Sequence, residues 1–381
     1  MQVKKNILVL SDWYIPAYKA GGPVKSIAAL THHLKNDFNF FVLTSNKDAF
    51  SKEPLPVKAD EWITGDNGER IYYCGDEKLT LSKLAEVIGS IEYDYVYLNS
   101  FFSKSFSIYP LLLKKQGKIK RPVVLAPRGM LGEGALSLKS KKKSIFINLS
   151  KLSGIHKNVV WHATSEQEAE EIKKVFGASA NIHLASNLIL PPLTKRTNYN
   201  KNGGELNVCF ISRISKKKNL LFALEVLKHI DEGKITFDVY GPAEDFAYNN
   251  DCVHFAKHLP KNILVNFKGE IEAPEVEAVL KQNHLFFLPT LNENFGHAIV
   301  EAMLNGCIPL LSDQTPWKNL EKSGIGWDLP LADKTAFITA VKKALLMDSK
   351  AFELQSVKNQ QFALSECTNP SHNEAYRQLF K

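Results

Sequence analysis

The stretch from residue 284 to residue 312 constrains the fold more than any other part of the chain. It reads HLFFLPTLNENFGHAIVEAMLNGCIPLLS: an apolar run, a polar turn, a nearly apolar helical segment and a second apolar run. Short apolar runs bounded by turn residues are typical of buried strands, and Asn305-Gly306 is a good helix end. The order strand, loop, helix, strand predicts a unit of parallel sheet that binds a ligand at the carboxyl ends of its strands.

Two carboxylates in this stretch are candidate ligand-binding groups. Glu301 lies among apolar neighbours in the helix, where a carboxylate is costly unless it is hydrogen-bonded. Glu293 lies eight positions earlier, in the loop. The backbone N–H groups from Phe295 to Ala298 form a natural anion site at the helix start, and an ionised Glu can accept two sugar hydroxyls. The alternative is that Glu301 caps a neighbouring loop and Glu293 is a solvated turn residue.

The alternation of strand and helix runs twice along the chain, which predicts two doubly wound α/β domains. The run NLILPPLTKR, with paired prolines, followed by NYNKNGGE, is the best interdomain linker. The predicted division is an N-terminal domain at 1–190, a linker at 191–204, a C-terminal domain at 205–360 and a C-terminal helix at 361–381 that can cross back to the N-terminal domain. In the first half, helices are expected at 24–34, 79–91, 106–115, 136–157 and 165–176, and a loop or hairpin at 46–75.

Length and composition favour a two-domain protein of the cytoplasm. The chain has 381 residues, and no stretch approaches eighteen consecutive apolar residues. The opening MQVKKNILVLSDWY predicts a first strand and not a signal peptide. The five cysteines are scattered without a CxxC pair, so we expect reduced, buried thiols and neither disulfides nor metal ligands.

The positive charge is concentrated in the first half. Residues 1–190 hold 26 Lys and Arg against 18 Asp and Glu, whereas the remainder is balanced at 22 of each. Residues 114–157 carry twelve basic residues and one acid, Glu133. A basic half beside a balanced one indicates an anionic partner, which could be nucleic acid, a lipid surface or a phosphorylated substrate; the alternative is a merely solvated surface.

Two further loops carry residues suited to phosphate. Gly21-Gly22 lies between the first strand and its helix, where a glycine pair lets backbone approach a ligand closely; the spacing is not G-x-G-x-x-G and gives little support to a nicotinamide cofactor. Arg213 follows a strand of the second half, and Lys218 lies five residues later. Two cations at the end of a strand suit a diphosphate.

Together these residues resemble glycosyltransferase family 4, the retaining group with the GT-B fold, in which two Rossmann-like domains face a central cleft. Glu293 and Glu301 match its Glu-x7-Glu motif, Arg213 and Lys218 its paired basic residues, and Gly21-Gly22 its N-terminal glycine loop. The resemblance spans nearly the whole chain, and PRGML, followed by a lysine-rich helix, makes the chain similar to the branch that builds bacterial surface polysaccharides.

The resemblance implies a C-terminal domain that binds a UDP- or GDP-linked sugar and an enzyme that needs neither metal nor cofactor. Glu301 would hold the ribose and Glu293 a sugar hydroxyl, while Arg213 and Lys218 neutralise the leaving diphosphate. The other donor-binding residues it implies are Gly21, Gly22, Gly241, Asn294, Phe295, Gly296 and His297.

The acceptor side departs from the family pattern, because Arg128 stands where many members carry His. Asn99, Arg128 and His162 are the acceptor-side candidates, and His162 is equally well explained as a core residue. The resemblance implies an undecaprenyl-diphosphate-linked sugar or another saccharide as acceptor. A basic amphipathic segment, Lys139–Lys151, is expected to bring the enzyme to the anionic inner membrane face as a peripheral protein.

Two other functions fit parts of the pattern. A GT-B epimerase of nucleotide sugars would use the same donor site, but the basic segment and the Arg213–Lys218 pair argue against it. A nucleic-acid-binding protein would use the basic half, yet no helix-turn-helix or RNA-recognition signature is present and aromatics are not interleaved with the charges. We therefore expect no nucleic-acid partner.

Overall fold

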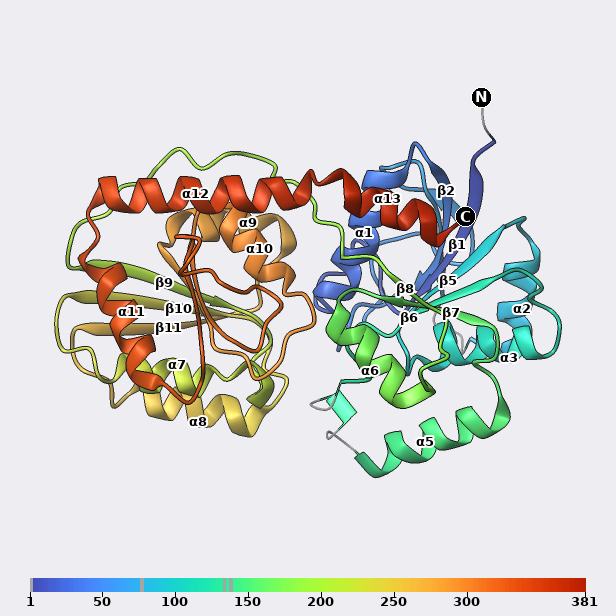
Figure 1. Cartoon of the computed structure of the whole chain (residues 1–381), viewed down its shortest axis with the longest axis horizontal. Helices are drawn as coiled ribbons and strands as arrows, with labels where there is room; N and C mark the ends of the chain where they lie inside the picture. The colour runs from blue at the N-terminus through green and yellow to red at the C-terminus, as the bar shows by residue number, and fades with distance from the viewer. Residues whose placement is uncertain (1–2, 76–78, 133–134, 137–139) are drawn as a thin grey trace. The chain divides into compact units, whose positions relative to one another are not determined.

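The structure is a computed structural model that describes residues 3–75, 79–132, 135–136 and 140–381. The chain forms two compact units (Figure 1): unit 1 comprises Met1–Leu190 together with Asn369–Lys381, and unit 2 comprises Pro191–Thr368. Unit 1 therefore takes its last helix from the far end of the sequence.

Unit 1 is built on an eight-stranded sheet with strand order β3-β4-β2-β1-β5-β6-β7-β8, parallel except for β3. Its strands are β1 (Lys5–Ser11), β2 (Phe38–Ser45), β3 (Trp62–Thr64), β4 (Arg70–Cys74), β5 (Tyr95–Asn99), β6 (Val123–Ala126), β7 (Val159–Ala163) and β8 (Ile182–Leu184). Its helices are α1 (Gly22–Leu34), α2 (Leu81–Gly89), a π-helical turn (Lys104–Ile108), α3 (Tyr109–Lys115), α5 (Ser140–Ser153), α6 (Glu166–Phe176) and α13 (Pro370–Leu379).

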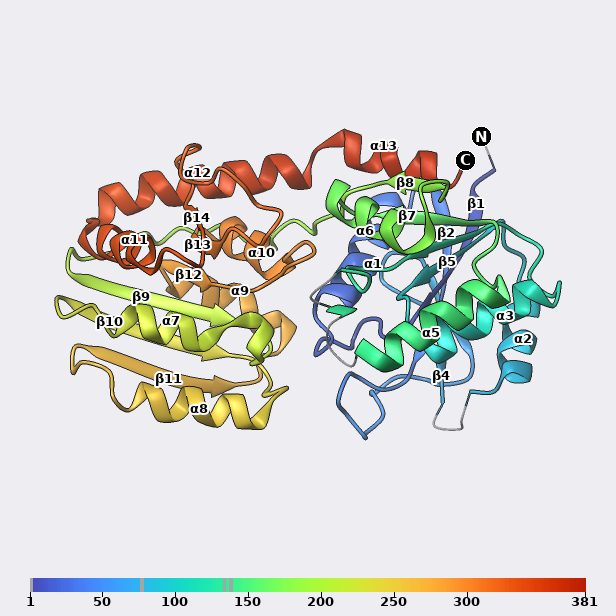
Figure 2. The ribbon, with the colours of Figure 1, turned by 60° about the horizontal axis from the view of Figure 1, so that its bottom comes forward.

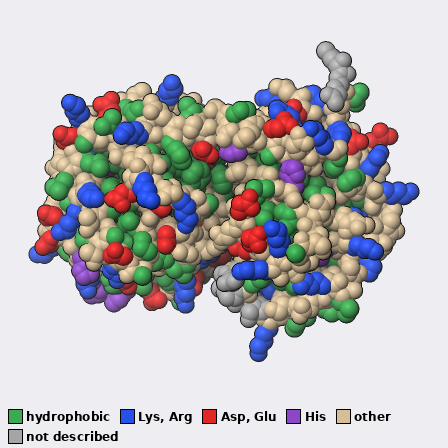
Figure 3. Space-filling view, in the orientation of Figure 1, with side chains coloured by type: hydrophobic (Ala, Val, Ile, Leu, Met, Phe, Trp, Pro, Cys, Tyr) green, Lys and Arg blue, Asp and Glu red, His purple; other side chains and the backbone are tan. Residues whose placement is uncertain are grey.

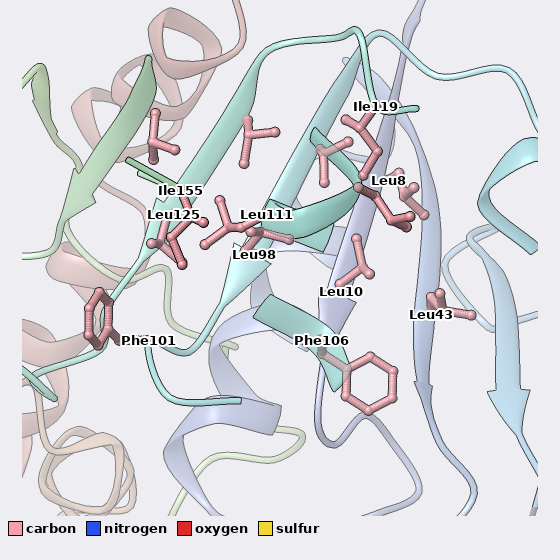
Figure 4. Packing of buried hydrophobic residues seen from close by; sticks show 14 of the residues in the cluster. Leu8, Leu10, Leu43, Leu98, Phe101, Phe106, Leu111, Ile119, Leu125 and Ile155 are labelled. Atoms are coloured by element: carbon pink, nitrogen blue, oxygen red, sulfur yellow. The ribbon is translucent and has the colours of Figure 1, made fainter. Parts of the chain in front are cut away.

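Alternating side chains of these strands feed two separate cores. Leu8, Leu10, Leu98 and Leu125 point to one face, where they pack with residues of α2, α3, α5 and α6 (Figure 4). Ile7, Val9, Tyr97 and Val124 point to the other face, which is covered by α1 and α13. Because strand side chains alternate with period two, apolar runs such as NILVL fill both cores at once.

Unit 2 is a six-stranded, all-parallel sheet with strand order β11-β10-β9-β12-β13-β14. The strands are β9 (Glu205–Ile211), β10 (Lys234–Tyr240), β11 (Ile263–Gly269), β12 (Leu285–Leu288), β13 (Ile308–Ser312) and β14 (Trp327–Leu329). Figure 2 shows its helices against the sheet: α7 (Leu220–Leu227), α8 (Phe246–Ala256), α9 (Ala273–Gln282), α10 (His297–Leu304), α11 (Lys334–Leu346) and α12 (Ser349–Cys367), with a short 3-10 turn at Lys216–Lys218. The predicted α/β class, with two doubly wound parallel sheets, is confirmed.

Several predicted elements have different bounds. The segment 46–75 contains the antiparallel pair β3–β4, so the hairpin alternative is the correct one. The expected helix at 136–157 is α5, which is described only from Ser140 to Ser153. The expected single helix at 361–381 is wrong: 361–367 end α12, the chain turns at Thr368–Asn369, and α13 alone belongs to unit 1.

All five cysteines are free and buried, as expected. Among the described residues, no helix combines the length and apolar character needed to cross a bilayer.

Candidate functional site

The catalytic candidates of unit 2 lie where the strand order reverses. The chain leaves β9 toward β10 on one side, and β12 pairs with β9 on the other, with Leu285 beside Val208. The loop after β9 carries Arg213 and Lys218, and the loop after β12 carries Glu293. In open α/β sheets, ligands bind outside the carboxyl ends of strands at this reversal. The topology therefore brings both loops to the position that suits a ligand.

The two loops are joined by backbone and side-chain hydrogen bonds. The N–H of Leu291 donates to the carbonyl of Lys217 at 2.8 Å, and the buried Thr290 hydroxyl donates to the same carbonyl at 3.1 Å. Asn219 takes a left-handed conformation, φ 59°, at the start of α7. These contacts hold the lysine-bearing turn against the glutamate-bearing loop.

Lys218 and Glu293 form an ion pair at the centre of this arrangement. The Lys218 ammonium donates to Glu293 Oε2, and the two side chains are only 12% and 15% exposed. The Glu293 N–H donates to the carbonyl of Gln314 at 2.9 Å, which fixes the backbone of the loop. The structure thus brings together a cation and a carboxylate that were predicted in different roles, and a phosphate would compete with Glu293 for Lys218.

Arg213 is also paired, with a different acid. Its Nη1 lies 3.1 Å from Glu244 Oε1, and both side chains are half exposed. Exposed pairs of this kind contribute only about 0–1 kcal/mol, so an incoming phosphate can exchange with Glu244 at little cost. Glu244 was not among the predicted residues, and its place after β10 gives no signal beyond its charge.

Gly241 has a steric reason to be glycine. Its φ is 135°, and an added Cβ would lie 2.0 Å from the carbonyl oxygen of Ser212. The end of β10 therefore approaches the residue that precedes Arg213, which packs the phosphate-side loop against the sheet. Lys217, in the turn after β9, has its pKa lowered by burial and by the charge of the adjacent Lys218.

The predicted helix start is α10, and one of its faces is open. Gly296 precedes it in the left-handed region at φ 81°. His297, Ala298 and Glu301 are partly exposed, whereas the rest of α10 is buried. Since residues four apart share a helix face, His297 and Glu301 lie on the same open side. The Phe295 carbonyl, just before the helix, accepts from the Trp317 indole at 2.6 Å, which anchors this turn.

In unit 1 the strand order reverses between β1 and β5, and Asp12 lies there. Ser11 pairs with Asn99 in register, so Asp12 and Ser100 follow neighbouring strand ends. The Ser103 hydroxyl donates to Asp12 Oδ1 at 2.7 Å, and burial raises the pKa of this carboxyl. Asp12 was not among the residues predicted from sequence; the signal available was an acid directly after the first buried strand.

Arg128 is held by a network of neutral side chains. Its guanidinium donates to Asn99 Oδ1 from Nε at 3.2 Å and from Nη2 at 2.9 Å, to the Tyr97 hydroxyl at 2.8 Å, and to Asn187 Oδ1. The buried Tyr376 of α13 is also hydrogen-bonded to it. Arg128 is partly exposed as a residue, and these hydrogen bonds fix the orientation of its guanidinium.

His162 and Asn99 are both buried. His162 is fully buried, its ring shared between the Tyr97 hydroxyl at 2.7 Å and the carbonyl of Ala185 at 2.8 Å. Burial first and the charge of Arg128 second lower the pKa of His162 to about 3. The structure therefore supports the core-histidine alternative. Asn99 belongs to the Arg128 network, and its buried amide nitrogen has no partner among the described residues.

The glycine loop of unit 1 is organised by a buried acid. The Asp48 carboxylate accepts the N–H groups of Tyr18 at 2.9 Å and Lys19 at 3.1 Å. Gly21 then takes φ 68° and precedes α1, which begins at Gly22. Asp48 thus fixes the backbone two and three residues before Gly21; it was likewise not among the predicted residues.

The described residues contain no group of three or more His, Cys, Asp or Glu that could hold a metal ion. Among the described residues, the loop after β9 carries Arg213 and the lysines of the turn Lys216–Lys218.

Comparison with protein families finds a match within the second unit. Residues 193–359 match the family model described as glycosyl transferases group 1. The matched residues cover most of unit 2. An uncharacterized 41.2 kDa protein in the cps region of Klebsiella pneumoniae is 22% identical over 320 residues, covering 76% of this chain and 79% of that protein.

Solved structures share the fold of the whole chain. Sucrose-phosphate synthase from Thermosynechococcus elongatus matches with TM-score 0.72 and 17% identity, covering 99% of both chains. HepE of Anabaena in complex with UDP-glucose matches with TM-score 0.64 and 14% identity, covering 98% of this chain and 99% of that one. WaaG, a glycosyltransferase involved in lipopolysaccharide biosynthesis, matches with TM-score 0.64 and 10% identity, covering 94% and 95%. The chain therefore has the GT-B fold.

Proposed function

We propose that the protein is a retaining glycosyltransferase that moves a sugar from a UDP- or GDP-linked donor to a saccharide acceptor. The observation that carries the proposal is the Lys218–Glu293 pair at the switch point of unit 2, within the region that matches the family model. A nucleotide-sugar donor is further supported by the similarity to HepE, whose structure contains UDP-glucose.

The proposed chemistry begins with an exchange of partners. The donor diphosphate takes Lys218 from Glu293 and Arg213 from Glu244, and both cations then neutralise the charge that develops on the leaving phosphate. Glu293, released from Lys218, accepts a hydroxyl of the donor sugar, and Glu301 on the open face of α10 accepts the ribose hydroxyls. In this proposal the two cations supply the charge that a metal ion would otherwise provide, so transfer needs no metal and no cofactor.

Unit 1 is proposed to bind the acceptor. Asp12 lies at its switch point and can accept a hydroxyl, while Arg128 can donate to a phosphate or a sugar oxygen. An acceptor carrying both groups, such as an undecaprenyl-diphosphate-linked sugar, satisfies both side chains. The cps-region relative favours polysaccharide synthesis as the setting, and such synthesis from nucleotide sugars would place the enzyme in the cytoplasm.

The decisive test is thermal unfolding with UDP, GDP, ADP and CMP in millimolar excess, for wild type and Glu301→Ala. A nucleotide at a hundred times its Kd stabilises a protein by about 2.7 kcal/mol, which is a shift of several degrees. A shift with UDP or GDP that is lost in Glu301→Ala supports the proposal and names the base. Absence of any shift would refute the donor site.

Transfer itself is then tested with the matching UDP- or GDP-sugar and isolated lipid-linked saccharides, with and without a chelator. Product with the anomeric configuration of the donor is expected, in equal yield with chelator. An inverted product, or conversion of the donor to its epimer without transfer, would contradict the proposal.

A further inference from the structure

The end of β13 and the loop after it support the loop that leads into α10. The supported loop comprises residues 290–296, and the supporting segment comprises residues 312–317. Three hydrogen bonds join the two segments: the Ser312 hydroxyl donates to the carbonyl of Thr290 at 2.5 Å, the N–H of Glu293 donates to the carbonyl of Gln314 at 2.9 Å, and the Trp317 indole donates to the carbonyl of Phe295 at 2.6 Å. The contacts advance along both segments in the same direction, so the support reaches the start of α10.

Trp317 is itself held firmly in place. It is only 8% exposed, and its indole packs edge-on against the Phe295 ring at 5.5 Å and the Phe362 ring of α12 at 6.2 Å. The hydroxyl of the buried Thr315 is hydrogen-bonded to the N–H and to the carbonyl of Trp317, both at 3.3 Å. Figure 3 shows hydrophobic side chains together at the surface over the part of unit 2 where Figure 1 draws α10. Packing and the Thr315 contacts therefore set the direction of the indole N–H.

The indole hydrogen bond fixes a peptide group that can otherwise turn over. The peptide between Phe295 and Gly296 is planar, with its C=O and N–H pointing in opposite directions. Gly296 has φ 81°, and glycine adopts positive and negative φ about equally well. A rotation of this peptide plane by about 180° therefore costs the backbone little and reverses the direction of the N–H. By binding the carbonyl, Trp317 selects one of the two orientations.

The selected orientation matters because Gly296 lies beside the proposed diphosphate position. A Cβ added to Gly296 would be 3.1 Å from Glu293 Cγ, and Glu293 pairs with Lys218, the cation proposed to meet the diphosphate. Because the Phe295 carbonyl points toward the buried indole, the Gly296 N–H points away from it. The N–H is thus directed to the outer side of the turn.

We infer that Trp317 is a positioning residue of the donor site: its indole N–H holds the Phe295–Gly296 peptide in the orientation in which the Gly296 N–H donates to the donor diphosphate. This rests on the proposed function and deepens it by naming the group that prepares the site for that diphosphate. Backbone donors that are oriented in advance stabilise developing charge without reorganisation. When only a fraction of the molecules has the competent orientation, the apparent Kd rises by the inverse of that fraction.

The first test compares binding of UDP and uridine to wild type and Trp317→Phe, with GDP and guanosine in their place if GDP is the nucleotide that stabilises wild type. Phenylalanine keeps an aromatic ring and removes the N–H donor. Trp317→Phe should bind the diphosphate about threefold to tenfold more weakly and the nucleoside as wild type does. The matched control is Trp327→Phe, since Trp327 is equally buried, 7% exposed, in β14 of the same unit; it should bind both ligands as wild type does.

The second test needs no ligand. Phe–Gly occurs twice in the sequence, at 176–177 and at 295–296. Isotope labelling of phenylalanine carbonyl carbons and glycine nitrogens therefore selects two amide signals by NMR. In Trp317→Phe the Gly296 signal should shift or broaden while the Gly177 signal stays unchanged, and the nucleoside diphosphate should return the Gly296 signal toward its position in liganded wild type.

An unchanged Gly296 signal in Trp317→Phe would overturn the inference. Equal losses of affinity for the diphosphate and the nucleoside would also overturn it, because that is the result of a purely structural role for Trp317. If wild type binds neither nucleotide, the proposed donor site fails, and the Gly296 signal still decides whether Trp317 holds this peptide.

Discussion

The Lys218–Glu293 pair allows the proposed exchange of partners to be measured. Two unit charges at about 4 Å attract by about 4 kcal/mol at an effective dielectric constant of 20. Part of this is offset by desolvation, since the side chains are only 12% and 15% exposed. We expect a coupling free energy of about 1–3 kcal/mol in a double-mutant cycle of Lys218→Met and Glu293→Gln.

The assay is urea unfolding of wild type, both single variants and the double variant, repeated with saturating UDP, or with GDP in its place throughout if GDP is the nucleotide that stabilises wild type. Without UDP, the losses of unfolding free energy in the two single variants should add up to more than the loss measured in the double variant. With UDP, the coupling should fall toward zero, because the diphosphate replaces Glu293 as the partner of Lys218. UDP affinity should fall about tenfold or more in Lys218→Met, as expected for a lost charge-assisted contact, and be kept or raised in Glu293→Gln.

A surface pair supplies the control. Lys334 and Glu225 lie 2.6 Å apart, but their side chains are 39% and 36% exposed, so their coupling should be about 0.2–1 kcal/mol and insensitive to UDP. The reasoning is refuted if the Lys218–Glu293 coupling is as small as the control, if UDP leaves it unchanged, or if Glu293→Gln weakens UDP as much as Lys218→Met does.

Three further predictions address the scaffold. Gly241→Ala should destabilise unit 2 by about 2 kcal/mol or more in denaturant unfolding, because its Cβ would meet Ser212 at a strained φ; a loss below about 0.5 kcal/mol would contradict this. Arg128→Lys should cost about 2–4 kcal/mol, since one ammonium cannot replace the fork that binds Asn99 and its neighbours; equal stability by thermal unfolding would refute it. The lowered pKa of His162, about 3 when folded, means that stability is full above the unfolded pKa of about 6.5 and falls with decreasing pH by up to about 1.4 kcal/mol per unit. The slope of unfolding free energy between about pH 6 and pH 4 should be smaller in His162→Gln by about that amount, and an unchanged slope would contradict the burial argument.

The sequence by itself predicted the buried strands of unit 2 and the charged residues on which the proposed function rests. Apolar runs such as NILVL and LFFL are long enough for buried strands and too short for helices, so they predict parallel sheets without any tertiary information. The spacing of Glu293 and Glu301 across Gly296 placed one carboxylate before a helix and the other within it, as the structure shows; that Glu301 lies on an open face of α10 came from the structure alone. The sequence also placed a paired-proline linker directly after residue 190, where the structure divides the two units.

Only the tertiary structure decided which of these elements meet. Buried parallel strands are nearly interchangeable in sequence, so the order that puts β9 beside β12, and hence Lys218 beside Glu293, cannot be read from local patterns. The Arg128 network likewise joins residues of β5, the segment after β8 and α13, which lie far apart in the chain, and burial rather than residue type excludes His162 from contact with substrate.

Helix α5 is a second case in which the local sequence pattern could not decide which residues are buried. Ile147 and the trio Ile145, Leu149 and Leu152 lie on opposite sides of it, so apolar periodicity offers two possible inward faces. In the structure Ile147 packs against the rest of unit 1, and the row Ile145, Leu149 and Leu152 stays exposed. The sequence thus provided the amphipathic character of the helix, and long-range packing decided its direction, because the free energy of burial depends on what the opposing surface can accept.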